Sequence, residues 1–298
     1  MNSATPPSGT RSGPRAAAAV ATPVCDRLLP GSQGVVLGST SRAAWLELGD
    51  FVVAIMPGGM PLMPNAVAVG RALHTTRFRP GARVRAGTDS LDAGDVTVDL
   101  AAATRWSPLA PSNEGYGPRD VRGRARQLLA APPPPEPSAA VPHLAASTRV
   151  ARDARGNDGV RRLLLAAEQR DAGLASDAAD LLVGRGRGLT PEGDDLLAAA
   201  AAAGASLGAA VGFDDPDRRT WTEALCPPCV RQRTTALSAT LLRLAAEGMV
   251  LEPVRAVLDL SRSPGRCRGD TARLRSVGHG TGRTYALGLG CIAALLAR

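Results

Sequence analysis

Two kinds of sequence pattern, one typical of strands and one typical of helices, follow each other along this chain and constrain its fold. Between residues 34 and 106, short segments carrying Val, Ile or Leu are separated by Gly, Pro, Asp and Ser. No long helical pattern interrupts them, which favours a small antiparallel sheet or a partly closed barrel. The predicted strands are Gly34–Leu37, Trp45–Leu48, Phe51–Met56, Ala66–Val69, Arg83–Ala86 and Val96–Leu100.

The second half of the chain has the periodicity of helices, with Leu and Ala in runs that Gly and Pro interrupt. The predicted helices are Arg162–Glu168, Leu174–Val183, Asp194–Val211, 229–248, 253–260 and 284–297. The basic stretch Arg262–Arg275 is predicted to be a solvated loop. The predicted fold class is therefore α+β, with an N-terminal antiparallel β-rich sheet or small barrel followed by an α-helical C-terminal half.

Composition divides the chain into four parts. Residues 1–28 precede the first strand pattern and are predicted to be a flexible extension, and residues 29–107 form the predicted β-rich domain. Residues 108–142 are rich in proline, which is typical of an extended spacer, with a short helix over Val121–Ala130. Residues 143–298 form the predicted helical domain, which carries glycine-rich site loops.

The formal charge of +8 comes from arginine, because the sequence contains no lysine. A basic balance permits an acidic partner such as nucleic acid. However, the arginines are dispersed, and aromatic residues that could stack on bases make up only 3% of the chain. Composition therefore disfavours nucleic-acid binding, and an arginine-rich nucleic-acid binder is the weakest alternative.

The cysteines number five, and an odd count in a chain of this length favours a reducing compartment over a disulfide framework. Cys226-Pro-Pro-Cys229 has the spacing of half a zinc site or of a redox pair, but no second such pair lies nearby, and a pair of small apolar residues in a proline turn is the favoured interpretation. The apolar stretches Leu196–Val211 and Tyr285–Ala297 are too short and too rich in Ala and Gly for membrane spans. We expect a cytoplasmic protein with no membrane partner.

Residues 184–195 form the segment best suited to chemistry, Gly-Arg-Gly-Arg-Gly-Leu-Thr-Pro-Glu-Gly-Asp-Asp. Its glycines allow backbone conformations and close approaches that side chains would block. Thr190 and Pro191 then have the form of a helix start, with a hydroxyl cap followed by proline at the first helical position. Asp194 and Asp195 fall in the first predicted turn. The structural alternative is a glycine-rich connector into a well-capped helix.

The charges of this segment narrow the type of ligand. A helix N-terminus attracts anions, and arginines on the loop strengthen that attraction. The two aspartates oppose direct phosphate binding at the same point. The mixture suits a small molecule with anionic and amide parts, or a phosphate approached through a divalent cation. The sequence does not identify any metal or cofactor.

Two further segments carry polar groups. A second glycine-rich loop, Gly278-His279-Gly280-Thr281-Gly282, precedes the last predicted helix. His279 could be a general acid or base or an oxyanion donor, the alternative being a structural hydrogen bond. Thr234 and Ser238 are four residues apart and would share a helix face, so their hydroxyls could turn toward a ligand or bond back to helix carbonyls.

These segments together define the predicted site. The predicted catalytic residues are Asp194, Asp195 and His279. The predicted substrate-binding residues are Gly184, Arg185, Gly186, Arg187, Gly188, Thr190, Gly193, Thr234, Ser238, Gly278, Thr281 and Gly282.

The three segments, in this order, resemble the bacterial family of oxamate carbamoyltransferase subunit AllH. The family string is close to Gly-Leu-Gly-x-Gly-Leu-Thr-Pro-Ser-Gly-Asp-Asp, and the segment 184–195 matches it except at Arg185 and Glu192, with Arg187 at the variable position. Thr234 to Ser238 resemble a later helix of the family, and Gly278 to Gly282 resemble its Gly-His-x-x-Gly loop. The resemblance covers about residues 30 to 298, and its most specific part is the first string.

The resemblance implies a role in purine and allantoin degradation, the phosphorolysis of oxalurate to oxamate and carbamoyl phosphate with partner subunits. We therefore expect an AllH-like transferase subunit that acts on a small ureido or carboxylate substrate. Glu192 stands where the family has Ser and would repel a phosphate, so this copy could take a different substrate or be an inactive partner. The alternative is a non-catalytic ligand-binding or scaffolding subunit.

Overall fold

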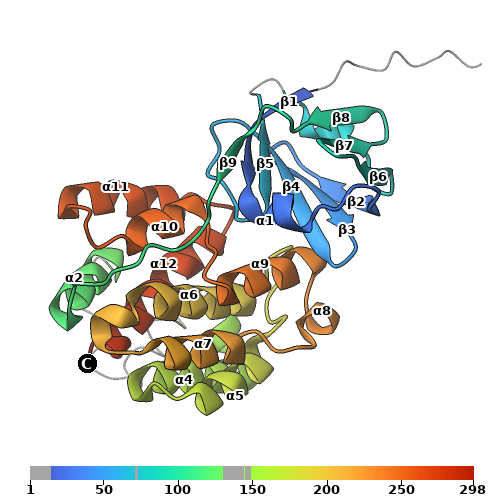
Figure 1. The fold of residues 1–298 in the computed structure, drawn as a ribbon. Coiled ribbons are helices and arrows are strands. Elements are labelled where there is room, and N and C mark those ends of the chain that lie inside the picture. Colours follow the sequence, from blue (N-terminus) through green and yellow to red (C-terminus); the bar gives the residue numbers. More distant parts are fainter. Residues whose placement is uncertain (1–14, 71–72, 130–143, 145–148) are drawn as a thin grey trace, which may run out of the picture. The chain divides into compact units, whose positions relative to one another are not determined.

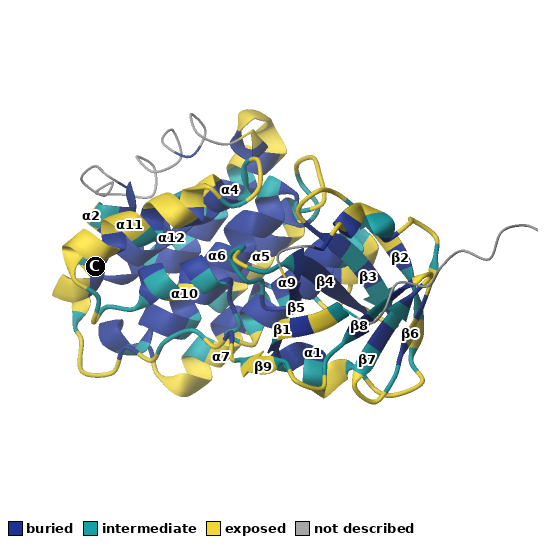
Figure 2. Cartoon of the chain, turned by 90° about the horizontal axis from the view of Figure 1, so that it is seen from above, coloured by how far each residue is buried: buried dark blue, intermediate teal, exposed yellow. Residues whose placement is uncertain are grey.

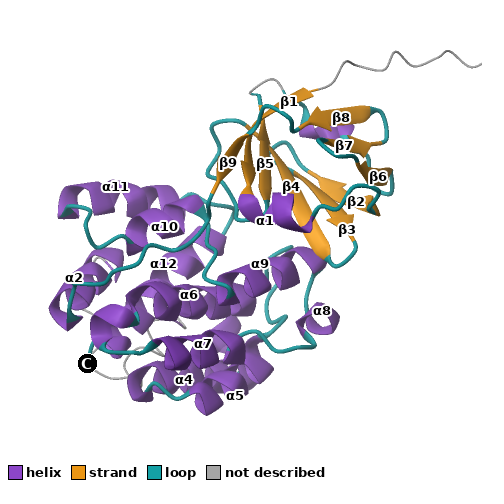
Figure 3. Cartoon of the chain, in the orientation of Figure 1, coloured by secondary structure: helices purple, strands orange, loops and turns teal. Residues whose placement is uncertain are grey.

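The structure is a computed structural model that describes residues 15–70, 73–129, 144 and 149–298. The chain divides into two compact units, which are described separately below. Residues up to 60 and from 65 to 106 form the first unit, and residues 61–64 and 107–298 form the second. The strands lie in the first unit and all helices of the described chain except α1 and the short η1 lie in the second (Figure 3).

The first unit is built on a mixed sheet of nine strands in the order β5-β4-β3-β2-β6-β7-β8-β1-β9. β1 also pairs with β5, so the strands from β5 to β1 close on themselves and β9 continues beside β1 (Figure 1). The strands are β1 Arg15–Ala21, β2 Gln33–Ser39, β3 Ala44–Leu48, β4 Phe51–Pro57, β5 Ala66–Val69, β6 Arg83–Ala86, β7 Ser90–Ala93, β8 Val96–Asp99 and β9 Thr104–Trp106. The short helices of this unit are α1 Thr22–Arg27 and η1 Thr75–Arg77.

Alternation of apolar and polar residues explains most of these strands. Buried and less buried residues alternate along β3 and along β8, so that one face of each strand packs inside. The turn between β3 and β4 has two residues, of which Gly49 takes φ +61°. The inner side of the unit is filled by large apolar side chains, which include Leu46, Ile55, Phe78 and Leu91.

The fold class predicted from sequence is confirmed, with corrections in detail. Each of the six predicted strands overlaps an observed strand, but the sheet is mixed because β4–β5, β1–β8 and β1–β9 are parallel pairs. β1 and α1 occupy residues 15–27, within the stretch predicted to be a flexible extension. Ala-rich β1 has low strand propensity, and its pairing with three strands overrides that preference.

The second unit is a helical assembly. Its helices are α2 Pro118–Leu129, α4 Ala154–Gln169, α5 Ala172–Leu182, α6 Glu192–Leu207, α7 Asp215–Ala224, α8 Val230–Arg233, α9 Ala236–Ala246, α10 Glu252–Leu258, α11 Pro264–Arg275 and α12 Thr281–Leu296. This unit also contains the short 3-10 helices η2 Val150–Arg152 and η3 Ala209–Val211.

α6 and α12 form the centre of the helical unit and are buried along nearly their whole length (Figure 2). Small residues make this possible, because α6 contains a run of alanines that neighbouring helices can approach from every side. Gly204 on α6 lies against the ring of Trp221 on α7, where an added Cβ would come within 2.4 Å of the ring. The indole nitrogen of Trp221 donates to the Ala200 carbonyl at 3.2 Å.

Several helical predictions need correction. The predicted solvated loop over 262–275 is mostly α11, and α7 had no counterpart in the prediction. The predicted helix over 229–248 is divided into α8 and α9 at an extended residue, Thr234. Residues 108–129 of the predicted spacer belong to the helical unit, where Val121 and Leu128 on α2 are buried. The proline run at 132–135 lies outside the described residues. None of the described helices is long and apolar enough to cross a membrane.

A buried amide fixes the segment that leads into α2. The side-chain nitrogen of Asn113 donates to the carbonyls of Ser206 and Leu258 at 3.0 Å each, and its oxygen accepts from the Leu260 backbone nitrogen at 3.0 Å. Asn113→Ala leaves these buried groups without partners and should lower the free energy of unfolding by about 2–4 kcal/mol. Urea denaturation measures the change.

The matched control is Asn157→Ala on the exposed side of α4, which should change stability by less than about 0.5 kcal/mol. Equal stability of the Asn113 and Asn157 variants would show that the buried amide does not hold this segment.

Candidate functional site

The glycine-rich loop after α5 is shaped by close backbone contacts. Gly184 takes φ +72°, and a Cβ there would lie 2.1 Å from the carbonyl oxygen of Arg233. A Cβ on Gly193 would lie 2.1 Å from the carbonyl oxygen of Leu182. Gly186 and Gly188 also have positive φ values. The backbone of this loop is thus packed against its neighbours, and the glycines are required by the fold of the loop itself.

α6 starts at Glu192, one residue later than the sequence pattern suggests. Pro191 is the residue before the helix, and no side chain caps it, so the predicted capping role of Thr190 is wrong. The Thr190 hydroxyl instead shares a hydrogen bond of 2.8 Å with the Thr281 hydroxyl at the start of α12. This bond joins the two glycine-rich loops, which are separate segments of the sequence.

Asp194 lies in the first turn of α6 and is buried, with 2% of its surface exposed. Its Oδ1 accepts from the Gly184 backbone nitrogen at 2.8 Å, and its Oδ2 accepts from the hydroxyls of Thr234 and Ser238. Burial raises the pKa of Asp194, while these hydrogen bonds act in the opposite direction. The carboxylate therefore connects the glycine loop, α6 and α9.

Thr234 and Ser238 do meet at one point, although they do not share a helix. Thr234 ends α8 with extended backbone, and Thr235 begins α9 by accepting from the Ser238 backbone nitrogen. The prediction of a common helix face is therefore wrong. The bend still aims both hydroxyls at Asp194, which excludes back-bonding to helix carbonyls for Ser238.

Asp195 has a different environment from its neighbour. Its side chain is 3% exposed, and its Oδ2 atom is buried without a hydrogen-bond partner among the described residues. Burial raises the pKa of Asp195 well above its usual value, and the nearby charge of Asp194 raises it further, while a hydrogen bond from Thr281 opposes the rise. Asp195 therefore holds its proton more tightly than an ordinary aspartate, and one of its oxygens has no partner among the described residues.

Tyr285 completes the surroundings of the two aspartates. It lies one helical turn after Thr281 on α12 and is 3% exposed. Burial raises the pKa of its phenol well above the usual value, and the charges of Asp195 and Asp194 raise it further. Tyr285 was not among the residues predicted from the sequence, although its spacing of four residues from Thr281 is a signal that could have found it.

Glu192 has a structural partner in this chain. Its Oε2 accepts from the backbone nitrogens of Arg149 and Val150, at 2.6 and 3.1 Å, just before α4. This carboxylate therefore fixes the start of η2. Its charge is one of the smaller contributions that raise the pKa of Asp195.

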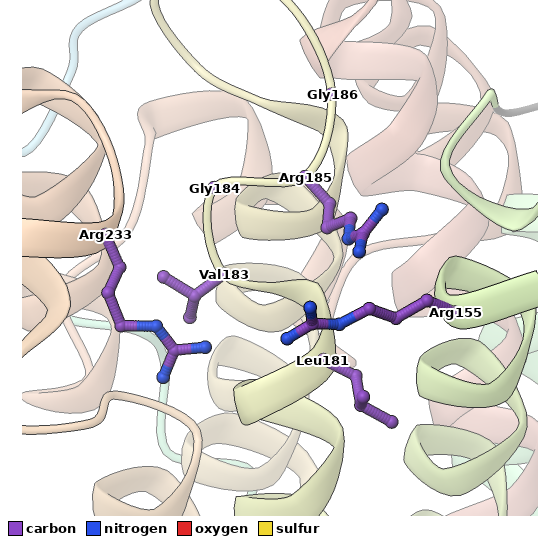
Figure 4. Close-up of a pocket in the computed structure, with 7 residues that line it drawn as sticks. All are labelled: Arg155, Leu181, Val183, Gly184, Arg185, Gly186 and Arg233. Atoms are coloured by element: carbon purple, nitrogen blue, oxygen red, sulfur yellow. The ribbon is translucent and has the colours of Figure 1, made fainter. Parts of the chain in front are cut away.

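Three arginines surround an open cavity of about 420 Å³ beside the glycine loop (Figure 4). Arg155 comes from α4, Arg185 from the loop and Arg233 from the end of α8. The remaining lining residues are Leu181, Val183, Gly184 and Gly186. The sequence pattern indicated Arg185 but neither Arg155 nor Arg233, because residues from three separate elements meet only in the folded chain.

Exposed carboxylates partly neutralise this arginine pocket. Arg233 donates to Asp180 Oδ1 at 2.6 Å, and Arg185 lies 3.4 Å from Asp153 Oδ2. Arg155 donates to the Asp180 carbonyl oxygen at 3.4 Å. Surface ion pairs of this kind contribute little stability, so an incoming anion can exchange for them at small cost.

The remaining predicted residues to be placed are His279, Arg187, Gly278 and Gly282. His279 is exposed, and no hydrogen bond to it is found within the described residues. Arg187 is also exposed. Gly278 takes φ +60°, and a Cβ on Gly282 would lie 1.8 Å from the Leu274 carbonyl oxygen, so both glycines serve the fold of their loop. A direct role for His279 or Arg187 stays a prediction.

No group of three or more His, Cys, Asp or Glu side chains suited to a metal ion is found in residues 15–70, 73–129, 144 and 149–298. The cysteines of the Cys226-Pro-Pro-Cys229 turn are both free. Burial raises the pKa of the Cys226 thiol to about 11, which keeps it protonated at neutral pH and disfavours the thiolate that metal binding needs. The interpretation as a proline turn agrees with these facts.

Most of the candidate site lies in a stretch of the chain that matches a known protein family. Residues 182–293 match the family of oxamate carbamoyltransferase subunit AllH. The resemblance found in the sequence motifs is thereby confirmed for this stretch, which we call the AllH segment. It runs from the end of α5 into α12 and contains Asp194, Asp195 and Thr281. No curated protein and no solved structure matches the chain.

The role of Asp194 can be tested by stability. Asp194→Ala removes three hydrogen bonds and leaves the Gly184 nitrogen and two hydroxyls unsatisfied. We expect it to lower the free energy of unfolding by about 2–4 kcal/mol. Chemical denaturation measures this, with Asp177→Ala on the exposed side of α5 as the control. A loss no larger than that of the control would remove Asp194 from its connecting role.

The role of Asp195 can be tested by pH. Because its pKa in the folded protein lies above its usual value of 3.8, the folded state holds the proton more tightly than the unfolded state. Its contribution to stability is therefore complete at low pH and is lost as pH rises through the raised pKa, by up to about 1.4 kcal/mol per pH unit. Asp195→Asn lacks this loss, so its stability relative to wild type should increase between pH 4.5 and 8. A constant difference across that range would contradict the raised pKa.

Proposed function

We propose that this chain is the AllH-type subunit of a carbamoyltransferase-type enzyme, and that its helical unit binds a small ureido or carboxylate substrate. The match of the AllH segment supports the subunit role. The observation that carries the site is Asp195, a buried carboxyl group with an unpartnered oxygen where the two glycine loops are joined. A neutral carboxyl can donate a hydrogen bond to a carbamoyl oxygen or give a proton to a leaving nitrogen.

The proposed substrates are oxalurate and phosphate in one direction, and oxamate and carbamoyl phosphate in the other. In the forward direction a phosphate oxygen attacks the carbamoyl carbon, and the bond from that carbon to the oxamate nitrogen breaks. The nitrogen then needs a proton, which Asp195 could supply. The arginine pocket would hold the carboxylate or the phosphate through charge-assisted hydrogen bonds.

A non-catalytic binding or scaffolding role is the second candidate, and one set of observations favours it. Asp194 and Glu192 both use their carboxylates to hold the backbone, and the arginines of the pocket already contact Asp153 and Asp180. In that case the subunit would hold ligand or partner subunits without reacting. Purine degradation and a cytoplasmic location remain parts of the proposal.

Binding can be measured on the isolated protein by thermal shift with oxamate, carbamoyl phosphate and phosphate. We expect Arg185→Ala to weaken oxamate or phosphate binding by about tenfold, because it removes one charge-assisted contact. Arg219→Ala on the exposed surface of α7 is the control and should bind as wild type. Equal binding by both variants would exclude the arginine pocket.

Turnover should be measured on the complex that co-purifies with this chain, as release of phosphate from carbamoyl phosphate and oxamate. Asp195→Asn should lower kcat by about 10²–10⁴ while leaving KM and assembly unchanged. Full activity of that variant in an assembled complex would favour the non-catalytic role. Absence of any oxamate-dependent turnover in the wild-type complex would overturn the substrate assignment.

A further inference from the structure

A second basic cavity, of about 520 Å³, lies in the helical unit among α2, α11 and α12. Its lining residues are Gln127, Arg268, Thr271, Ala272, Arg275, Ser276 and Arg283. It shares no residue with the arginine pocket of the proposed function. All of these residues except Gln127 belong to the AllH segment.

One face of α11 supplies most of this cavity. Arg268, Thr271, Ala272 and Arg275 follow the spacing i, i+3, i+4 and i+7, which places them on a single side of the helix. A helix normally turns an apolar side toward its neighbours. Here the side that faces the cavity carries two arginines, and Arg283 from the first turn of α12 adds a third.

The charges of this second cavity are not neutralised by the protein. Within the described residues no carboxylate pairs with Arg268, Arg275 or Arg283, in contrast to the arginine pocket beside the glycine loop. The one hydrogen bond found for these three guanidinium groups runs from Arg275 to the Leu128 carbonyl oxygen at 2.7 Å. Three cations around one cavity repel each other, and a bound anion would relieve that repulsion.

The amide of Gln127 provides an independent observation. Its Oε1 atom is buried at the edge of the cavity and has no hydrogen-bond partner in the described structure. A buried amide oxygen without a partner is unfavourable. A ligand hydroxyl can satisfy it, or the amide can turn so that its NH₂ group donates to a ligand oxygen.

We propose that this cavity is an oxyanion site for phosphate, free or as the terminal group of a small phosphorylated molecule. The guanidinium groups of Arg268, Arg275 and Arg283 would donate to the phosphate oxygens, and Gln127 would contact a further oxygen. The volume lies within the usual range of small-molecule sites and exceeds what one phosphate fills. The site therefore has room for an organic group attached to the phosphate.

The test uses the full-length protein and inorganic phosphate, titrated by isothermal calorimetry at constant ionic strength with chloride as the balancing anion. Arg268→Ala and Arg283→Ala should each weaken phosphate binding by at least about tenfold, because each removes a charge-assisted contact. Both side chains are exposed, so folding should be unaffected. Arg266→Ala, an exposed arginine of α11 outside the cavity, is the matched control and should bind as wild type.

Arg155→Ala in the other pocket separates this proposal from the proposed function. Loss of phosphate binding in Arg155→Ala alone would assign the anion to the arginine pocket and overturn the second site. Equal weakening in Arg266→Ala and Arg283→Ala would show a general charge effect and would also overturn it. Binding that responds only to Arg268 and Arg283 supports the second site whatever the carbamoyl substrate proves to be. A wild-type protein that binds no phosphate refutes it.

Discussion

The carboxylate of Asp194 is the contact on which the geometry of the helical unit's candidate site depends. It receives hydrogen bonds from the backbone of the glycine loop and from two hydroxyls, at the end of α8 and on α9. The two hydroxyls lie 40 and 44 residues along the chain from Asp194, and the buried carboxylate brings them to the same point as the glycine loop. Because the group is out of water, its three hydrogen bonds are costly to lose. The positions of Gly184, Thr234 and Ser238 therefore depend on one side chain.

The two adjacent aspartates differ in their hydrogen bonds and in how tightly they hold a proton. Asp194 uses its oxygens in bonds to protein, whereas Asp195, the next residue on the same helix, keeps one oxygen without a partner. Two carboxylates this close cannot both ionise easily in a buried place. The one with more hydrogen-bond donors is the better place for the charge, so the proton is favoured on Asp195. The negative charge is therefore favoured on Asp194 and the proton on Asp195 because of burial and the hydroxyl donors, although both residues are aspartates.

The sequence predicted the main features of this architecture but not all of its contacts. Alternating apolar residues located the strands that have strong β-propensity, but Ala-rich β1 is recognisable only from its partners. Glycine spacing located both site loops, and the bond between Thr190 and Thr281 brings them together. Arg155 and Arg233 could not be selected, because no local pattern records that α4 and α8 meet at the loop. The break at Thr234 could not be predicted, because the two residues between α8 and α9 are threonines and neither proline nor glycine marks the end of a helix there.

The order of the strands along the chain affects how the first unit folds during synthesis. Of the described strands β1 is synthesised first, yet its three partners are β5 at residues 66–69, β8 at 96–99 and β9 at 104–106. During synthesis the first strand must therefore wait for most of the unit before it can pair on both sides. Contacts between residues so distant in sequence form slowly, because a long loop must close before they are gained. Until then β5 and β8 present unpaired edges, which are the surfaces through which partly folded sheets join to other chains.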